Sequence, residues 1–396
     1  MPQSWKSDES NIAGAREARF FSLRRYVMNS RKTFALIDLS AYKQNLLYLS
    51  RKASPAKLMV VVKADAYGHG AVELSRAARD IGIERLAVAF LEEGIKIREG
   101  GVDLPILVLN YVDRDEIPIA GKFGLTLTLC SFGQLEEIVD LEVPLPDFHI
   151  VVDTGMRRLG MEWEDSLRLF ESAISKGIRI TGAYTHFATA DEKESDFVSE
   201  QQDSFDRFLA GLGEIPLDGF ETHISNSAGT IFLDNSRYDC VRAGIATYGL
   251  QPSIIVDNNL IPILEWKTCI SYLKEIHAGY SVSYGRTFLA NRDMLVATIP
   301  VGYADGYSRL LSNKGYVIIA GKRCRVLGRV CMDQFVVDVS HIERKISVGD
   351  EVVIIGSQEG ERITAEEMAD LCGTINYEVV CSISSRVPRI YRKGEN

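Results

Sequence analysis

A lysine follows a short apolar run near residue 60, in the stretch Val60-Val61-Val62-Lys63-Ala64-Asp65-Ala66-Tyr67-Gly68-His69-Gly70. The run Leu58–Val62 is typical of a parallel strand buried on both faces, and two glycines then lead to a helical segment from Ala71. A lone lysine at a strand end usually extends its charge into water. Burial instead lowers the pKa of the amine and frees it to attack a carbonyl group. Lys63 is therefore the first candidate for covalent chemistry.

Other polar side chains follow later apolar runs, at the points where strands should end. In a parallel α/β barrel these positions meet at one face and carry the reactive groups. The stretch Ser225–Thr230 also has the small residues that a phosphate-binding loop needs, although such a stretch is often only a turn. The candidate residues are Tyr67, Asp153, Arg158, His186, His223, Asn226, Ser227, Arg242, Gly244 and Ile245.

Strands and amphipathic helices alternate from Lys32 onward, which predicts a (β/α)8 TIM-type barrel. A doubly wound open sheet is the alternative, but no G-x-G-x-x-G turn follows the first strand. The expected strands are Leu58–Val62, Arg85–Phe90, Pro105–Asn110, Leu125–Cys130, Phe148–Asp153, Ile178–His186, Phe220–Ile224 and Asp239–Ala246. The expected helices include Ala71–Ile81, Leu91–Glu99, Phe132–Val139, Glu164–Ser175 and Ser199–Leu212.

The pattern changes near residue 265 to short strands separated by Gly, Asn and Asp, which predicts a mainly β C-terminal domain. One helix is expected near Thr364–Cys372, opened by the capping box Thr364-x-x-Glu367. The predicted domains are an N-terminal extension over 1–32, the barrel over 33–264 and the β domain over 265–396. Expected strands of the last are Leu295–Pro300, Tyr316–Ala320, Arg325–Val330, Phe335–Val339 and Glu351–Gly356.

Composition excludes several classes of protein. The 396 residues carry a net charge of −9 without a Lys/Arg-rich block, so nucleic acid and anionic membranes are not expected partners. No apolar run is long enough to span a bilayer. Seven scattered cysteines without a C-x-x-C pair predict free thiols in a reducing compartment, which we take to be the cytoplasm.

The first thirty residues fit no targeting segment, because they lack an apolar core and contain Asp8, Glu9 and Glu17. Phe20–Met28 could form a short basic amphipathic helix. A simple extension, with Met28 as an alternative start, is the favoured interpretation.

A metal site is not expected. A barrel hydrolase would need His69, His186 and His223 with Asp153, but these histidines have neither H-x-H nor H-E-x-x-H spacing.

The stretch from Val60 to Gly70 resembles the cofactor motif of bacterial alanine racemases, and similarity extends from about Thr33 to Arg392. The run Asn376–Arg389 resembles the carboxyl-terminal signature of that family. The resemblance implies that Lys63 holds pyridoxal 5′-phosphate (PLP) as an internal aldimine. It also implies interconversion of L- and D-alanine, which supplies D-alanine for peptidoglycan.

Several cofactor contacts follow from this resemblance. Arg242 would face the pyridine nitrogen, and because a guanidinium only donates, that nitrogen would stay unprotonated. His186 would lie beneath or beside the ring in a supporting role. The phosphate would be held by Asn226, Ser227, Gly244 and Ile245, with hydroxyl groups from Tyr67 and Tyr377.

Racemisation needs acid/base groups on both faces of the substrate Cα. Lys63 would serve one face. The segment Ser281–Phe288 resembles the family segment with the tyrosine base, which gives Tyr284 the second role. In the family, the β domain of one subunit covers the site of the other in a head-to-tail homodimer, so Tyr284 would come from the partner subunit.

The same arrangement would bring two further segments from the partner, Pro300–Gly306 and Arg329–Gln334. The Met332 amide would bind the substrate carboxylate, and Arg158 would pair with that carboxylate or with the cofactor phenolic oxygen. The implied entrance or supporting residues are Tyr303, Arg309, Cys331 and Asp333.

One position departs from the family pattern. Many members carry a carbamylated lysine that orients the substrate arginine, whereas this chain has Val151 there. An ion or another side chain would have to replace it. Pocket width is not visible in a sequence, so a serine or broad-specificity racemase is an alternative. A PLP-carrying binding protein without turnover is another.

Overall fold

The computed structural model describes residues 31–192, 195–213 and 219–393, and the expected helix Phe20–Met28 lies outside them. The described chain divides into two compact units. The barrel unit holds residues 38–263 and the last described residues from Tyr391; the β unit holds residues 31–37 and Leu264–Ile390. This division differs from the boundary expected at residue 33, because strand β1 (Phe34–Asp38) pairs with β10 (Leu264–Cys269), with Phe34 opposite Lys267.

Parallel strands form the centre of the barrel unit, in the order β4-β3-β2-β9-β8-β7-β6-β5. A bridge between Leu107 and Thr126 joins the two ends of this sheet, so the predicted barrel is confirmed. Each expected strand is present, although most are shorter than expected. They are β2 (Lys57–Val61), β3 (Arg85–Val88), β4 (Ile106–Val108), β5 (Leu127–Leu129), β6 (Phe148–Val151), β7 (Ile180–Tyr184), β8 (Glu221–His223) and β9 (Cys240–Ala243).

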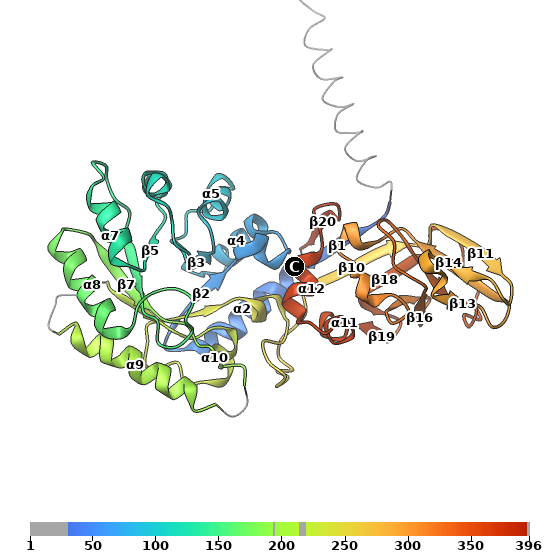
Figure 1. Cartoon of the computed structure of the whole chain (residues 1–396). Coiled ribbons are helices and arrows are strands. Elements are labelled where there is room, and N and C mark those ends of the chain that lie inside the picture. Colours follow the sequence, from blue (N-terminus) through green and yellow to red (C-terminus); the bar gives the residue numbers. More distant parts are fainter. Residues whose placement is uncertain (1–30, 193–194, 214–218, 394–396) are drawn as a thin grey trace, which may run out of the picture. The chain divides into compact units, whose positions relative to one another are not determined.

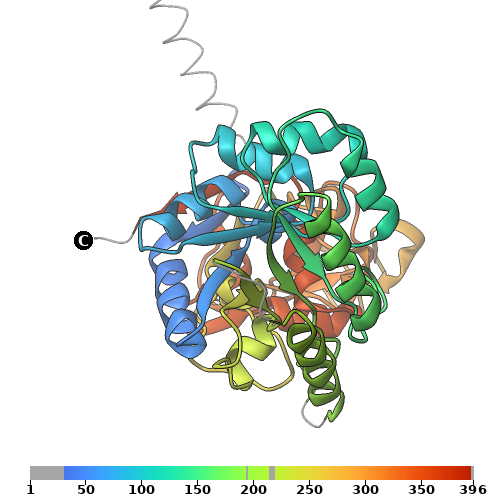
Figure 2. The same cartoon turned by 90° about the vertical axis from the view of Figure 1, so that its left-hand side faces the viewer.

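Helices surround these strands, as Figure 2 shows nearly end-on. Side-chain caps fix several starts: Asp38 accepts hydrogen bonds from the amides of Ser40 and Ala41, and Ser131 accepts from that of Gln134. The helices are α2 (Leu39–Ala53), α3 (Lys63–Tyr67), α4 (Ala71–Arg79), α5 (Leu91–Glu99), α6 (Ile117–Lys122), α7 (Phe132–Val139), α8 (Trp163–Ser175), α9 (Phe197–Gly211) and α10 (Ser227–Phe232). Among the described residues, no helix is long and apolar enough to cross a bilayer.

The β unit, orange to red in Figure 1 apart from the blue strand β1, is built mainly from antiparallel strands. Ile276, Met294, Val296 and Leu327 are buried together in one of its apolar clusters. Its strands are β1, β10, β11 (Tyr272–Ile276), β12 (Ser281–Val282), β13 (Phe288–Leu289), β14 (Met294–Ile299), β15 (Tyr316–Ile319), β16 (Lys322–Leu327), β17 (Phe335–Asp338), β18 (Glu351–Gln358), β19 (Glu361–Ile363) and β20 (Arg389–Arg392), the last of which runs into the barrel unit's final residues.

The helix expected near Thr364 is present as α11 (Ala365–Cys372), and the Thr364 hydroxyl accepts a hydrogen bond from the Glu367 amide. The prediction of a single helix here is wrong, because α12 (Asn376–Ser382) follows it. This second helix is only seven residues long, so it shows too few turns for its apolar period to stand out.

Candidate functional site

Lys63 lies two residues after the end of β2 and opens a turn with unusual handedness. The four residues from Ala64 to Tyr67 have φ between 52° and 55°, which is left-handed helical backbone. This backbone costs L-residues roughly 1–2 kcal/mol each. Contacts with α5 and α4 hold the turn: the Ala64 amide donates to Glu93 at 2.6 Å, and Asp65 accepts from the Ala71 amide at 3.1 Å. The direction of the Lys63 side chain is therefore set by a strained and well-supported turn.

Arg242, at the carboxyl end of β9, is buried in a cage of acceptors. Its Nη1 donates to Nδ1 of His223 at 2.6 Å and to the His223 carbonyl at 2.9 Å. Its Nη2 reaches the carbonyls of Thr185 and Ile224 at 2.6 and 3.0 Å, and Nδ1 of His186 at 3.1 Å. The Tyr184 ring lies 5.0 Å from the guanidinium carbon.

The acceptors of this cage engage the four Nη hydrogens of Arg242, but none of them engages its Nε–H. Among the described residues, that group has no acceptor. Burial lowers the pKa of Arg242 to about 10, so the guanidinium stays charged near neutral pH. Arg242 therefore presents one charged donor to an acceptor that the described chain does not supply.

A chain of hydrogen bonds leads from Arg242 into the barrel. Because Arg242 can only donate, His223 must accept at Nδ1, and its neutral ring then carries a proton on Nε2. That nitrogen lies 2.9 Å from Nδ1 of His149. Burial and the charge of Arg242 hold the pKa of His223 well below its ordinary value, and burial with the nearby Arg85 lowers that of His149 to about 3.

Unpaired backbone amides lie beside Arg242, at the starts of α10 and of the short helix Ile245–Tyr248. The Asn226 side chain caps α10 through the Gly229 amide, and the Ser227 hydroxyl accepts from the Gly244 amide at 2.9 Å. Within the described chain, no acceptor pairs with the amides of Ser227 or Ile245. First-turn amides have no partner inside their own helix, so these donors suit a bound anion.

The other barrel candidates surround these groups. Tyr67 is buried at the end of the left-handed turn, and a Cβ on Gly244 would lie 2.6 Å from its hydroxyl. Withdrawal from water, with the charges of Arg242, Arg158 and Lys63, holds the pKa of His186 well below its ordinary value. Arg158 is exposed after β6 and makes no hydrogen bond or ion pair within the described residues, while Val151 is buried.

The geometry argues against the metal alternative. Both ring nitrogens of His223 are engaged, by Arg242 and by His149, so this histidine has no lone pair for a metal ion. No group of three metal-ligating side chains occurs among the residues that the structure describes.

Tyr284 projects from the β unit, and its side chain is 71% exposed. It opens a short helical turn after Ser283, whose φ of 64° is left-handed. The Ser283 hydroxyl donates to the Arg329 carbonyl at 2.5 Å and lies 3.4 Å from Sγ of Cys331. The tyrosine is thus tied to the segment that carries Met332.

Met332 and Tyr303 lie on two loops of the same unit that are bonded to each other. The amides of Tyr303 and Ala304 donate to the carbonyls of Cys331 and Met332, at 3.1 and 3.0 Å. In a trans peptide the N–H points opposite to the carbonyl, so the Met332 amide points away from Tyr303. No acceptor for this amide occurs among the described residues.

The remaining candidates also lie in the β unit. Arg309 opens a short helix, Arg309–Leu311, and Tyr377 lies half-buried in α12. Asp333 accepts a hydrogen bond from Arg386 at 2.7 Å. The sequence-predicted residues therefore form two groups, one at the carboxyl ends of the barrel strands and one in the β unit, where Tyr377 lies in α12 and Arg309 in its short helix.

Comparison with known proteins identifies the family of this chain. The model of the alanine racemase N-terminal domain matches residues 37–252, and that of the alanine racemase C-terminal domain matches residues 263–391. The chain belongs to the alanine racemase family. It is therefore an enzyme of the isomerase class, in a family of PLP-dependent racemases.

Individual relatives agree over nearly the whole chain. An alanine racemase from Halothermothrix orenii is 43% identical over 373 residues, which cover 92% of this chain and 97% of that one. The crystal structure of alanine racemase from Bacillus anthracis with bound L-Ala-P has a TM-score of 0.86 at 35% identity, covering 92% and 95% of the two chains. That of Bartonella henselae alanine racemase with covalently bound PLP has a TM-score of 0.82 at 29% identity, covering 91% and 99%.

Sequence reasoning missed several residues of this racemase fold that support the predicted groups. Glu93 and His149 support Lys63 and Arg242 in the barrel unit, and Asp305 and Arg386 support the loops of the β unit. His149 could have been noticed as the one polar residue in an otherwise apolar strand, Phe148–Val151.

Proposed function

We propose that the protein is an alanine racemase that holds PLP on Lys63. The observation that carries this is the set of unpaired donors: the Nε–H of Arg242 suits the pyridine nitrogen, and the amides of Ser227 and Ile245 suit the phosphate. The described residues therefore fit the cofactor. When bound, PLP withdraws electron density from the substrate Cα and so acidifies its C–H bond.

The remaining phosphate contacts are proposed on the same basis. The Asn226 side chain and the Gly244 backbone shape the loop, and Tyr67 and Tyr377 add hydroxyl donors. Each supplies a hydrogen-bond donor or a close backbone approach, and hydrogen bonds to an ionised acceptor such as phosphate are stronger than those between neutral groups. His186 accepts from Arg242 at Nδ1 and helps to orient the guanidinium.

Two groups move the proton. One of the pair, Lys63 Nζ and Tyr284 Oη of the partner subunit, removes the proton from one face of Cα. The other returns a proton to the opposite face, and the roles exchange in the reverse direction. Because both steps occur at the same carbon, the only net change is inversion of the configuration at Cα.

We infer that a second copy of the chain completes the site. On the β unit, Tyr284, Tyr303 and Met332 expose 71%, 44% and 53% of their surface, which is unusual for aromatic and apolar side chains gathered on bonded loops. A head-to-tail homodimer would cover them. The Met332 amide and Arg158 would then bind the substrate carboxylate, with Tyr303, Arg309, Cys331 and Asp333 at the entrance.

The cellular role is inferred from the product. D-alanine would supply peptidoglycan synthesis. All seven cysteines lie in the described part of the chain and are free thiols, which suits a reducing cytoplasm.

The test combines a spectrum with turnover. Purified protein should absorb between 300 and 500 nm, and L-alanine should lose its optical activity when added. Lys63→Ala should abolish the covalent band and the turnover, while Lys57→Ala, at the opposite end of β2, should keep both. No band in PLP-saturated protein would refute the proposal. A band without turnover of L-alanine or L-serine would favour the carrier alternative, and faster turnover of L-serine would favour the broader racemase.

A further inference from the structure

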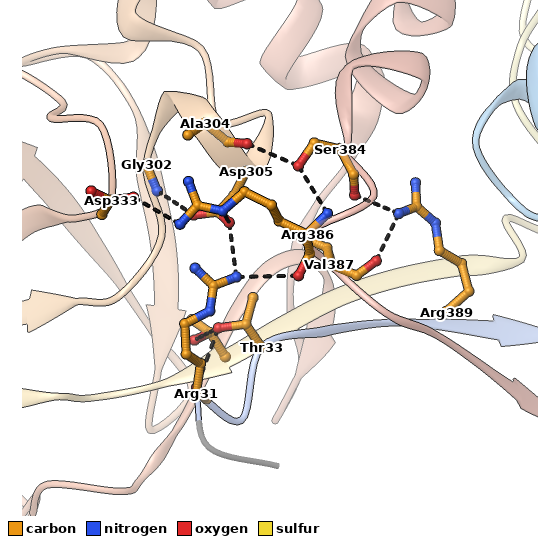
Figure 3. A network of polar contacts seen from close by, with 11 residues as sticks. Arg31, Thr33, Gly302, Ala304, Asp305, Asp333, Ser384, Arg386, Val387 and Arg389 are labelled. Atoms are coloured by element: carbon orange, nitrogen blue, oxygen red, sulfur yellow. Dashed lines mark hydrogen bonds and ion pairs between the residues drawn. The ribbon is translucent and has the colours of Figure 1, made fainter. Parts of the chain in front are cut away.

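Two carboxylates in the β unit are joined by one arginine. Arg386 donates from Nη2 to Asp333 at 2.7 Å, and its Nε lies 3.5 Å from Oδ1 of Asp305 (Figure 3). Asp333 directly follows Met332, and Asp305 closes the short helix that begins at Tyr303. Arg386 therefore links two loops. One carries Met332, whose amide is proposed to bind the substrate carboxylate, and the other carries Tyr303, a proposed entrance residue.

Asp305 is fully buried and anchors its own loop. Its Oδ2 accepts from the Gly302 amide at 3.0 Å, and its Oδ1 accepts from Arg31 at 2.8 Å. The same segment is held from the other side, where Ser384 donates its hydroxyl to the Ala304 carbonyl at 2.8 Å. A buried carboxylate needs such partners, and Arg31 alone would keep Asp305 paired if Arg386 were removed.

Asp333 has a different environment. Its side chain is 59% exposed and that of Arg386 is 43% exposed, so their ion pair contributes little to stability. Gly302 packs directly against the neighbouring backbone, since a Cβ there would lie 2.2 Å from the Met332 carbonyl oxygen. The Asp333–Arg386 pair thus adds a side-chain tether to a peptide already held on one side by backbone bonds.

We propose that Arg386 is a positioning residue that, through Asp333 and Asp305, holds the Met332 amide in the orientation needed to bind a substrate carboxylate. The inference rests on the proposed function. Without the tether, the carbonyls of Cys331 and Met332 keep their bonds from Tyr303 and Ala304, but the backbone at Asp333 gains freedom. Binding of the carboxylate must then restrict that freedom, and affinity falls.

The experiment compares Arg386→Met, Arg386→Lys and the isosteric Asp333→Asn in PLP-saturated protein. Arg386→Met and Asp333→Asn should each raise the KM for L-alanine about tenfold, while kcat stays within about twofold. The inhibition constant of acetate, a carboxylate without an amine, should rise in parallel. Arg386→Lys should recover part of the loss, because an ammonium can still pair with Asp333. Arg344→Met, which removes the exposed pair with Glu359, is the matched control and should change neither value.

Unchanged KM and acetate inhibition in both Arg386→Met and Asp333→Asn would overturn the proposal. So would loss of the PLP band or a large fall in melting temperature in Arg386→Met, because either would show a structural role. If wild-type protein neither binds PLP nor racemises alanine, the proposed function fails and this inference with it. If wild-type protein is active and the variants match it, only the positioning role fails.

Discussion

Nδ1 of His149 lies 2.9 Å from Nε2 of His223, inside the barrel and two hydrogen bonds away from Arg242. The direction of each bond is fixed by the arginine, which can only donate, so both rings must remain neutral to keep the chain intact. A proton added to His149 or His223 would place two donors opposite each other in a buried site.

The first prediction concerns acid stability. Burial and Arg85 lower the pKa of His149 in the folded protein to about 3, against about 6.5 in an unfolded chain. Between these values the unfolded chain binds more protons, so the free energy of unfolding falls as pH drops below about 6.5. The slope is up to ~1.4 kcal/mol per pH unit for each such histidine.

The measurement is the melting temperature of wild type and of His149→Gln between pH 7.5 and 4.5. As the pH falls, the melting temperature should decline less steeply in the variant than in wild type. His341→Gln, at an exposed position, is the control, and equal slopes in wild type and His149→Gln would contradict the prediction.

The barrel was predictable because most of its strands are short apolar runs with polar residues at or just after their carboxyl ends. These polar residues include Lys63, His186, His223 and Arg242. The hydrogen-bond chain was not predictable, because His149 meets His223 only through the register of β6, β7 and β8. A single histidine in an apolar strand gives no sign of its partner.

Other features depend on pairings that are distant in sequence. Strand β1 pairs with β10 across more than two hundred residues, so a boundary drawn from local pattern placed it in the barrel. Asp305 and Arg386 meet in the same way. The left-handed turn after Lys63 has no clear local signal, because Ala and Tyr do not favour such backbone and Asp adopts it only as a single residue.

The second prediction uses that turn. Ala64 has φ of 52° and is exposed, and glycine adopts this backbone without steric cost. Ala64→Gly relieves roughly 1–2 kcal/mol of backbone strain and loses about 0.4–1 kcal/mol because glycine is freer in the unfolded chain. The net stabilisation of up to ~1 kcal/mol should be visible as a small rise in melting temperature. Ala210→Gly is the matched control: Ala210 is exposed in the last turn of α9, so there the same change should destabilise, by at most about 1 kcal/mol. A fall in melting temperature for both variants would show that the turn is not strained.

The third prediction concerns cofactor affinity. A Cβ on Gly244 would lie 2.6 Å from the Tyr67 hydroxyl, so Gly244→Ala must push this proposed phosphate donor aside. Loss of one hydrogen bond to a charged group is worth about 1.5–3 kcal/mol, which predicts a rise of at least tenfold in the dissociation constant for PLP. Fluorescence titration of apoprotein measures it. Gly133→Ala in α7, where a Cβ meets open space, should leave the constant unchanged. An unchanged constant in Gly244→Ala would remove Tyr67 from the phosphate site.

The fourth prediction tests whether two subunits share each site. If Lys63 of one subunit acts with Tyr284 of its partner, Lys63→Ala and Tyr284→Phe homodimers should both be inactive, since loss of an acid/base group costs about 10²–10⁴-fold. After equal amounts are mixed and allowed to exchange subunits, half of the dimers are mixed, and each mixed dimer has one intact site and one doubly altered site. Activity should therefore recover to about one quarter of wild type.

The mixing result separates the shared site from a site built within one chain. If Lys63 and Tyr284 acted within the same subunit, every chain in the mixture would lack one of them, and activity would stay at the level of the separate variants. Tyr272→Phe is the matched control, because Tyr272 is also an exposed tyrosine of the β unit. It should be fully active alone, and its mixture with Lys63→Ala should give about half of wild-type activity, since half of the lysines remain. Mass spectrometry of the mixture confirms exchange, so that absence of recovery with exchanged subunits would contradict the two-subunit site.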